Sequence, residues 1–99
     1  MVVKFVEVYE STRAHSNDKN RAYLLREVFV NPEQVVCIRS DESFEQLLSE
    51  GLLPENLDKR QQFTRIYLNR GQVGLDVVVV GQAAQIEQKL NSGKQLLKG

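Results

Sequence analysis

Cysteine and histidine, the residues that most often act as nucleophile, general base or metal ligand, each occur once in the chain. Cys37 lies between Val36 and Ile38 in an apolar segment, so we expect it to pack in the core as a small hydrophobic residue. His15 lies in a polar segment, three residues before Asp18, with no signature of a convergent catalytic partner. A single cysteine allows no internal disulfide, and one Cys and one His do not make up a usual zinc site.

The acidic residues and glycines also lack the spacing of known catalytic sites. Many of the carboxylates flank one short predicted helix, where they are typical of a solvated surface and of favourable charge at a helix start. They match neither a calcium-binding loop nor a catalytic acid pair. Gly71, Gly74 and Gly81 do not form a phosphate-binding loop. The sequence therefore predicts no catalytic residue, no metal and no organic cofactor, and so a protein that is not an enzyme.

Basic and aromatic residues suggest nucleic-acid binding as an alternative function. Alternating arginine and aromatic side chains on a strand can neutralise phosphates and stack on bases. The residues that could do this lie in the first polar loop (Arg13, Lys19, Arg21) and on a later strand (Arg65, Tyr67, Arg70). An arginine next to a tyrosine is, however, equally typical of any solvent-facing strand.

The composition is that of one soluble globular domain, with 99 residues, 11.3 kDa, 41% apolar and 26% charged side chains. Thirteen basic and thirteen acidic residues give zero net charge. This balance argues against a dedicated nucleic-acid coat or an acidic DNA mimic, and it favours self-association. The N-terminal residues 1–5 lack the basic and long apolar regions of a signal peptide, and no apolar run approaches membrane-spanning length. We expect a cytoplasmic protein with a single domain over residues 1–99.

Hydrophobic periodicity predicts an α+β fold with an antiparallel sheet of about five strands, made of two hairpins plus one strand. A short middle helix and a C-terminal helix are expected to pack on the sheet. Ser43 and Gln46 fit a capping box at the start of the middle helix, and Asn91–Gly93 fit the end of the last one, leaving a frayed tail over 93–99. The predicted strands are 2–9, 21–30, 34–39, 63–69 and 72–80, and the helices are 43–50 and 82–91.

Two segments carry a resemblance to a known group of proteins. Residues 29–38 have an apolar, Asn-Pro, two-residue spacer, apolar pattern. Residues 64–90 have a Thr-x-Ile-x-Leu strand, a glycine turn, a second strand and an amphipathic helix. Together they resemble the small FlbD/FlbEa-type accessory proteins of bacteria and their phages. The chain differs in its N-terminal hairpin, in an insert over 39–62 and in Gly81 at the helix start. The resemblance implies a small regulatory or accessory role and no catalytic residue.

Four consecutive valines, Val77 to Val80, suggest that the protein associates with itself. Consecutive strand residues point to opposite faces, so both faces of this strand need a cover. The C-terminal helix has a narrow apolar stripe, so a second copy would cover the other face through an interface of Val78, Val80, Ala83, Ile86 and Leu90. Alternatively, the first hairpin or the helix with Phe44, Leu47 and Leu48 could cover it within one chain. The function predicted from the sequence is a homo-oligomeric accessory or regulatory protein that acts by protein–protein interaction, with nucleic-acid binding as the alternative.

Overall fold

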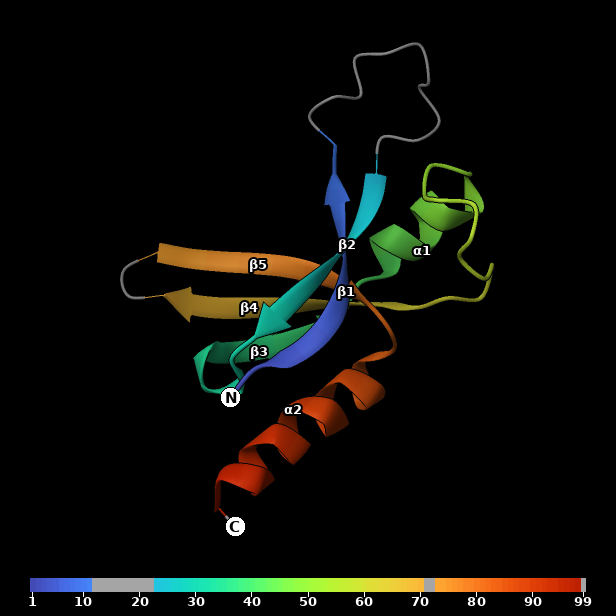
Figure 1. Ribbon diagram of the computed structural model, residues 1–99. Coiled ribbons are helices and arrows are strands. Elements are labelled where there is room, and N and C mark those ends of the chain that lie inside the picture. The colour runs from blue at the N-terminus through green and yellow to red at the C-terminus, as the bar shows by residue number, and fades with distance from the viewer. Residues whose placement is uncertain (12–22, 71–72, 99) are drawn as a thin grey trace.

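The computed structural model describes the backbone of residues 1–11, 23–70 and 73–98, and this part of the chain forms five strands and two α-helices (Figure 1). The α+β fold predicted from the sequence is confirmed. The predicted first loop and the turn at Gly71 lie largely outside the described residues. In chain order the elements are β1 (Val3–Glu10), β2 (Tyr23–Val30), a 3-10 turn (Pro32–Gln34), β3 (Val35–Ser40), α1 (Glu42–Ser49), β4 (Phe63–Arg70), β5 (Val73–Val80) and α2 (Ala83–Lys98).

The five strands form one antiparallel sheet in the order β2-β1-β5-β4-β3. Both predicted hairpins are present, and each is paired along eight residues. β1 joins β5 at two pairs, Glu7↔Val79 and Val8↔Val78. Figure 1 shows the β1–β2 ribbon crossing the β4–β5 ribbon at a steep angle. The sheet therefore consists of two ribbons joined at a short seam, and β2 and β3 are its outer strands.

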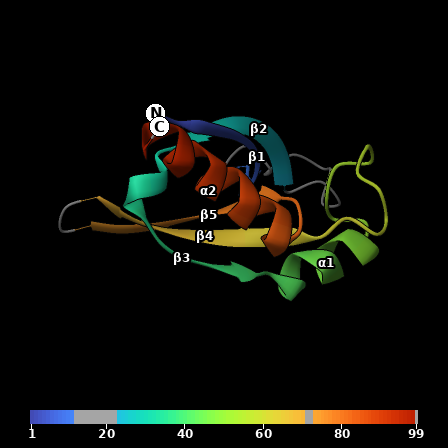
Figure 2. The ribbon, with the colours of Figure 1, turned by 90° about the horizontal axis from the view of Figure 1, so that it is seen from below.

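Helix α2 covers one face of the sheet (Figure 2). Ile86 and Leu90 lie four residues apart on one side of this helix, and both are buried. They pack against apolar side chains from four strands, which form the first core cluster with them: Phe5, Val30, Ile66, Val77 and Val79.

The opposite face of the sheet is covered at one end by α1 and the segment that follows it. Here Val8, Leu53, Phe63 and Val78 are buried, and the apolar side of α1 packs against them. The ring of Phe44 lies edge-on to the ring of Phe63, with a centroid distance of 6.0 Å. Each face of the sheet thus has its own core within a single chain.

This second core removes the premise of the predicted oligomer interface. Val78, Ile86 and Leu90 are buried inside one chain, and Val80 and Ala83 are partly buried. The premise was that the face of Val78 and Val80 lacks a cover. The structure shows instead the alternative considered above, in which the helix with Phe44, Leu47 and Leu48 covers that face. Val78, Ile86 and Leu90 therefore need no second copy to cover them.

The helix boundaries differ from the prediction for local reasons. Asp41, not Ser43, is the N-cap of α1, and its side chain accepts a hydrogen bond of 3.1 Å from the backbone N–H of Ser43. Helix α2 continues through Gly93 to Lys98. A glycine lowers helix stability by about 1 kcal/mol relative to alanine but does not by itself end a helix. A turn follows α1 at Pro54, where the N–H of Leu57 donates to the Pro54 carbonyl at 3.4 Å.

Candidate interaction surface at the sheet edges

The outer strand β3 exposes apolar side chains next to an unpaired backbone edge. A bulge between Val35 and Cys37 shifts the pairing of β3 with β4 by one residue. Val36 is 65% exposed, and Cys37 is exposed as well. The prediction that Cys37 packs in the core is therefore wrong. An apolar run can be buried on both faces only in an inner strand, whereas β3 is the last strand of the sheet and is bulged at this point.

A groove of about 300 Å³ runs between β3 and α2. Apolar side chains of β3 and polar side chains of α2 line it together, with Glu87 and Asn91 contributed by the helix. Figure 2 shows β3 at the outer margin of the sheet, on the side away from the β1–β2 hairpin. The other residues that line the groove are Pro32, Val35, Val36, Cys37, Ile38 and Leu90.

The Asn31-Pro32 motif positions the start of β3. The Asn31 side chain accepts a hydrogen bond of 3.0 Å from the backbone N–H of Glu33, and Pro32 is buried at the start of the 3-10 turn. A proline at the start of a strand is typical of an edge strand, because the proline nitrogen has no proton to donate to a neighbour. This turn places Glu33 at one end of the β3 edge, and Arg39 lies near the other end. Both side chains are exposed, and the described part of the chain provides neither with an ion pair.

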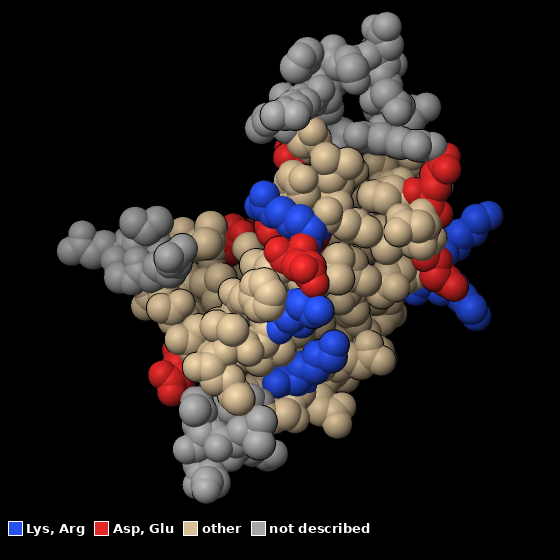
Figure 3. All heavy atoms as spheres, viewed as in Figure 1, with Lys and Arg blue, Asp and Glu red and all other residues tan. Residues whose placement is uncertain are grey.

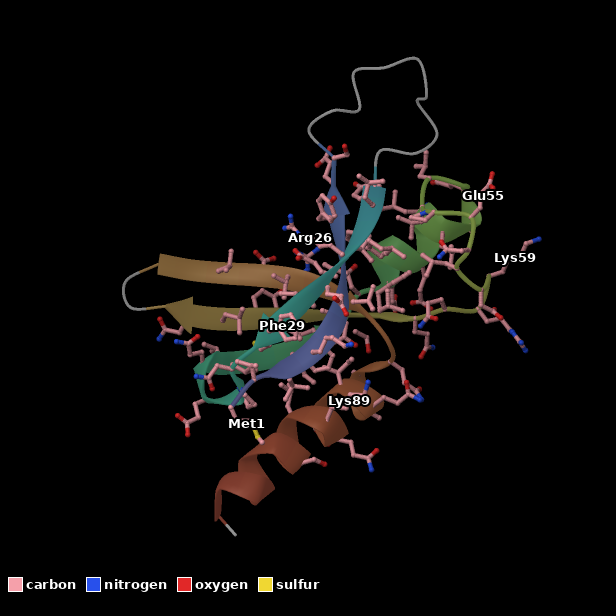
Figure 4. The ribbon with its side chains drawn as sticks, viewed as in Figure 1. Met1, Arg26, Phe29, Glu55, Lys59 and Lys89 are labelled. Carbon is pink, nitrogen blue, oxygen red and sulfur yellow. The ribbon has the colours of Figure 1, made fainter. Side chains whose placement is uncertain are left out.

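The opposite edge, β2, differs from β3 because charged pairs protect it. Figure 4 shows Phe29 and Arg26 on this strand, and Phe29 is 60% exposed. Arg26 Nε donates to Glu7 Oε1 at 2.8 Å, and the Arg26 guanidinium lies 4.0 Å from the centre of the Tyr9 ring. The hydrogen bond to Glu7 raises the pKa of Arg26 above its ordinary value. Lys4 and Glu27 form a further ion pair, at 3.1 Å.

Arg65, on the inner strand β4, lies between two carboxylates. Its Nε and Nη2 donate to Asp41 Oδ2 at 2.9 and 2.8 Å, and its Nη1 donates to Asp76. Burial alone would raise the pKa of Asp41, but hydrogen bonds from Ser43 and Arg65 outweigh it and lower that pKa. Burial likewise disfavours charge on Arg65, and the bonds to Asp76 and Asp41 outweigh this, so the pKa of Arg65 is raised. This cluster fixes the start of α1 to the sheet.

The residues proposed for nucleic-acid contact do not form a basic surface in the described chain. Arg65 is neutralised by Asp41 and Asp76, and Tyr67 is half-buried opposite Cys37 in the pairing of β4 with β3. Arg70 ends β4, but its side chain is not described. In Figure 3, basic and acidic side chains are interspersed over the visible face. Arg13, Lys19 and Arg21 lie outside the described residues.

Features of other functional classes are also absent from the described part of the chain. Among residues 1–11, 23–70 and 73–98, no three side chains of His, Cys, Asp or Glu are grouped as they would be to hold a metal ion. His15 lies outside these ranges. None of the helices described here has the length and apolar character needed to cross a membrane.

The fold is that of a small α+β protein with an antiparallel sheet, two separate cores and an exposed, bulged edge strand. No family model matches the sequence, and searches of curated proteins and of solved structures found no similar protein. The edge residues Glu33, Val36 and Arg39 were not among the site residues predicted from the sequence. The signal that could have pointed to this edge is Asn31-Pro32 before a short strand, since a proline there is typical of an edge strand.

Proposed function

We propose that this chain is a small non-enzymatic accessory or regulatory protein that acts by protein–protein interaction, and that its first partner is a second copy of itself. The observation that carries the proposal is the β3 edge, where the last strand of the described sheet presents the exposed Val36 beside a groove. Exposed edges of this kind are the usual sites at which a further strand is added to a sheet.

Two properties of the whole chain support a protein partner over a nucleic acid. The net charge is zero, so no long-range repulsion opposes association between copies. Arg65 on strand β4 already has two carboxylate partners, and a phosphate would have to displace them. The resemblance to FlbD/FlbEa-type accessory proteins implies the same kind of role.

The experiment that tests this function has two parts. Light scattering of the purified chain over about 10–500 μM should give a mass above 11.3 kDa that rises with concentration, as expected for a weak, small interface. Binding of a fluorescent single-stranded oligonucleotide should be negligible at low salt. A particle of one chain throughout the range, or oligonucleotide binding with a steep salt dependence, would contradict the proposal.

A further inference from the structure

We infer that two copies of this chain pair antiparallel through β3, about a two-fold axis near Val36, and so join two five-stranded sheets into one. This inference rests on the proposed self-association and adds the surface, the direction and the register of the contact. The free side of β3 and the charges near its two ends determine this contact.

The free side of β3 has both components that strand addition requires. One side of the strand is paired with β4, and the other side ends the sheet. Added strands gain affinity from backbone hydrogen bonds and specificity from side chains that enter neighbouring pockets. Val36 is the apolar side chain that projects here, and the groove of about 300 Å³ between β3 and α2 lies beside it.

The charges at the two ends of the edge select a second copy as the occupant. Glu33 and Arg39 each lie three residues from Val36, on opposite sides of it. Antiparallel pairing of two identical edges about Val36 brings Glu33 of each copy near Arg39 of the other. A parallel pairing would instead place Glu33 near Glu33. The edge is therefore self-complementary in charge only in the antiparallel arrangement, and an isologous contact of this kind closes as a dimer.

The two-fold symmetry of the contact limits it to two copies. Each copy has one β3 edge, and the contact uses the free side of both. The other edge, β2, carries the Arg26–Glu7 and Lys4–Glu27 ion pairs, and charged side chains also discourage strand addition. Once β3 is occupied, the joined sheet would present only β2 edges at its two ends.

The test is a charge exchange measured on the full chain. Glu33→Arg and Arg39→Glu each place like charges together at both ends of the paired edge, so either one should raise the dimer dissociation constant roughly 10-fold or more. The double variant Glu33→Arg/Arg39→Glu restores opposite charges and should return the constant to within roughly 3-fold of the original. Lys59→Glu, in the exposed segment on the other side of the molecule (Figure 4), is the matched control and should have no effect.

The sole cysteine gives an independent readout of the register. In the proposed pairing the two Cys37 residues lie next to the two-fold axis, each one residue from Val36, so a short bismaleimide should join them efficiently. A dimer that is insensitive to both charge exchanges and does not cross-link would overturn the β3 assignment and leave self-association standing. A particle of one chain at every concentration would overturn self-association as well. A partner from another protein whose binding is lost on Val36→Asp, with no dimer, would show that the edge takes a foreign strand and would overturn the inference.

Discussion

Leu53 offers the sharpest test of whether the second face of the sheet is covered within one chain. It lies in the irregular segment after α1, is 3% exposed and packs with Val8, Phe63 and Val78. Replacing a buried leucine with alanine typically lowers stability by about 2–5 kcal/mol, depending on how well the site collapses. Because Leu53 lies outside regular secondary structure, its own segment can shift toward the sheet and fill part of the gap. We therefore expect Leu53→Ala to lower the free energy of unfolding by about 2–3 kcal/mol, near the lower end of that range.

The measurement is urea unfolding followed by circular dichroism, since the chain has no tryptophan. In a domain of this size the loss corresponds to a fall in melting temperature of roughly 10–20 °C. Leu24→Ala, at an exposed position of β2, is the control and should change stability by less than about 1 kcal/mol. The two variants should be compared at two protein concentrations. A loss below about 0.5 kcal/mol for Leu53→Ala would refute the reasoning, because such a small value is typical of surface positions.

Three further variants test local features of the fold. The pKa of Asp41 is lowered in the folded chain, so the unfolded chain binds a proton at this residue first as the pH falls below about 4, and the free energy of unfolding declines. Asp41→Asn should remove this part of the acid sensitivity, measured as the difference in unfolding free energy between pH 7 and pH 3. Gly81 has φ of +133°, and an added Cβ would lie 3.0 Å from Ile86 Cδ1, so Gly81→Ala should lower stability by about 1–3 kcal/mol in the same urea assay. Thr64 Oγ1 donates a buried hydrogen bond of 2.8 Å to the Gly81 carbonyl. Thr64→Val leaves that carbonyl without its donor and should lower the free energy of unfolding by about 1–3 kcal/mol. Unchanged thermal stability would contradict this expectation.

The hairpins and helices could be predicted from the sequence because their signals are local. Alternation over β1, β2, β4 and β5 and the spacing of Phe44, Leu47 and Leu48 each arise within a few residues. The cover over Val78 could not be predicted in the same way. It depends on Leu53, which lies in a segment without periodicity and reaches the sheet only through the turn after α1.

The edge position of β3 was the main feature that the sequence analysis missed. An apolar run such as Val35 to Ile38 has the same composition whether the strand is inner or outer. Strand order decides between these cases, and strand order is set by long-range pairing that periodicity does not encode. The analysis also gave Arg65 a role in phosphate binding, because the sequence does not show that Asp41 and Asp76 meet it from two different elements.

The short seam between β1 and β5 has a consequence for how the chain folds. Each hairpin pairs neighbouring segments, so its loop-closure entropy is small and it can form early. The seam joins the first strand to the last one, so it closes a loop that contains most of the chain but forms only two residue pairs. Its formation must therefore coincide with the packing of Phe5 and Val79 under α2 and of Val8 and Val78 under α1. The two ribbons are expected to behave as separate folding units whose docking is the late, cooperative step, and opening at the seam is the route by which the native sheet would come apart.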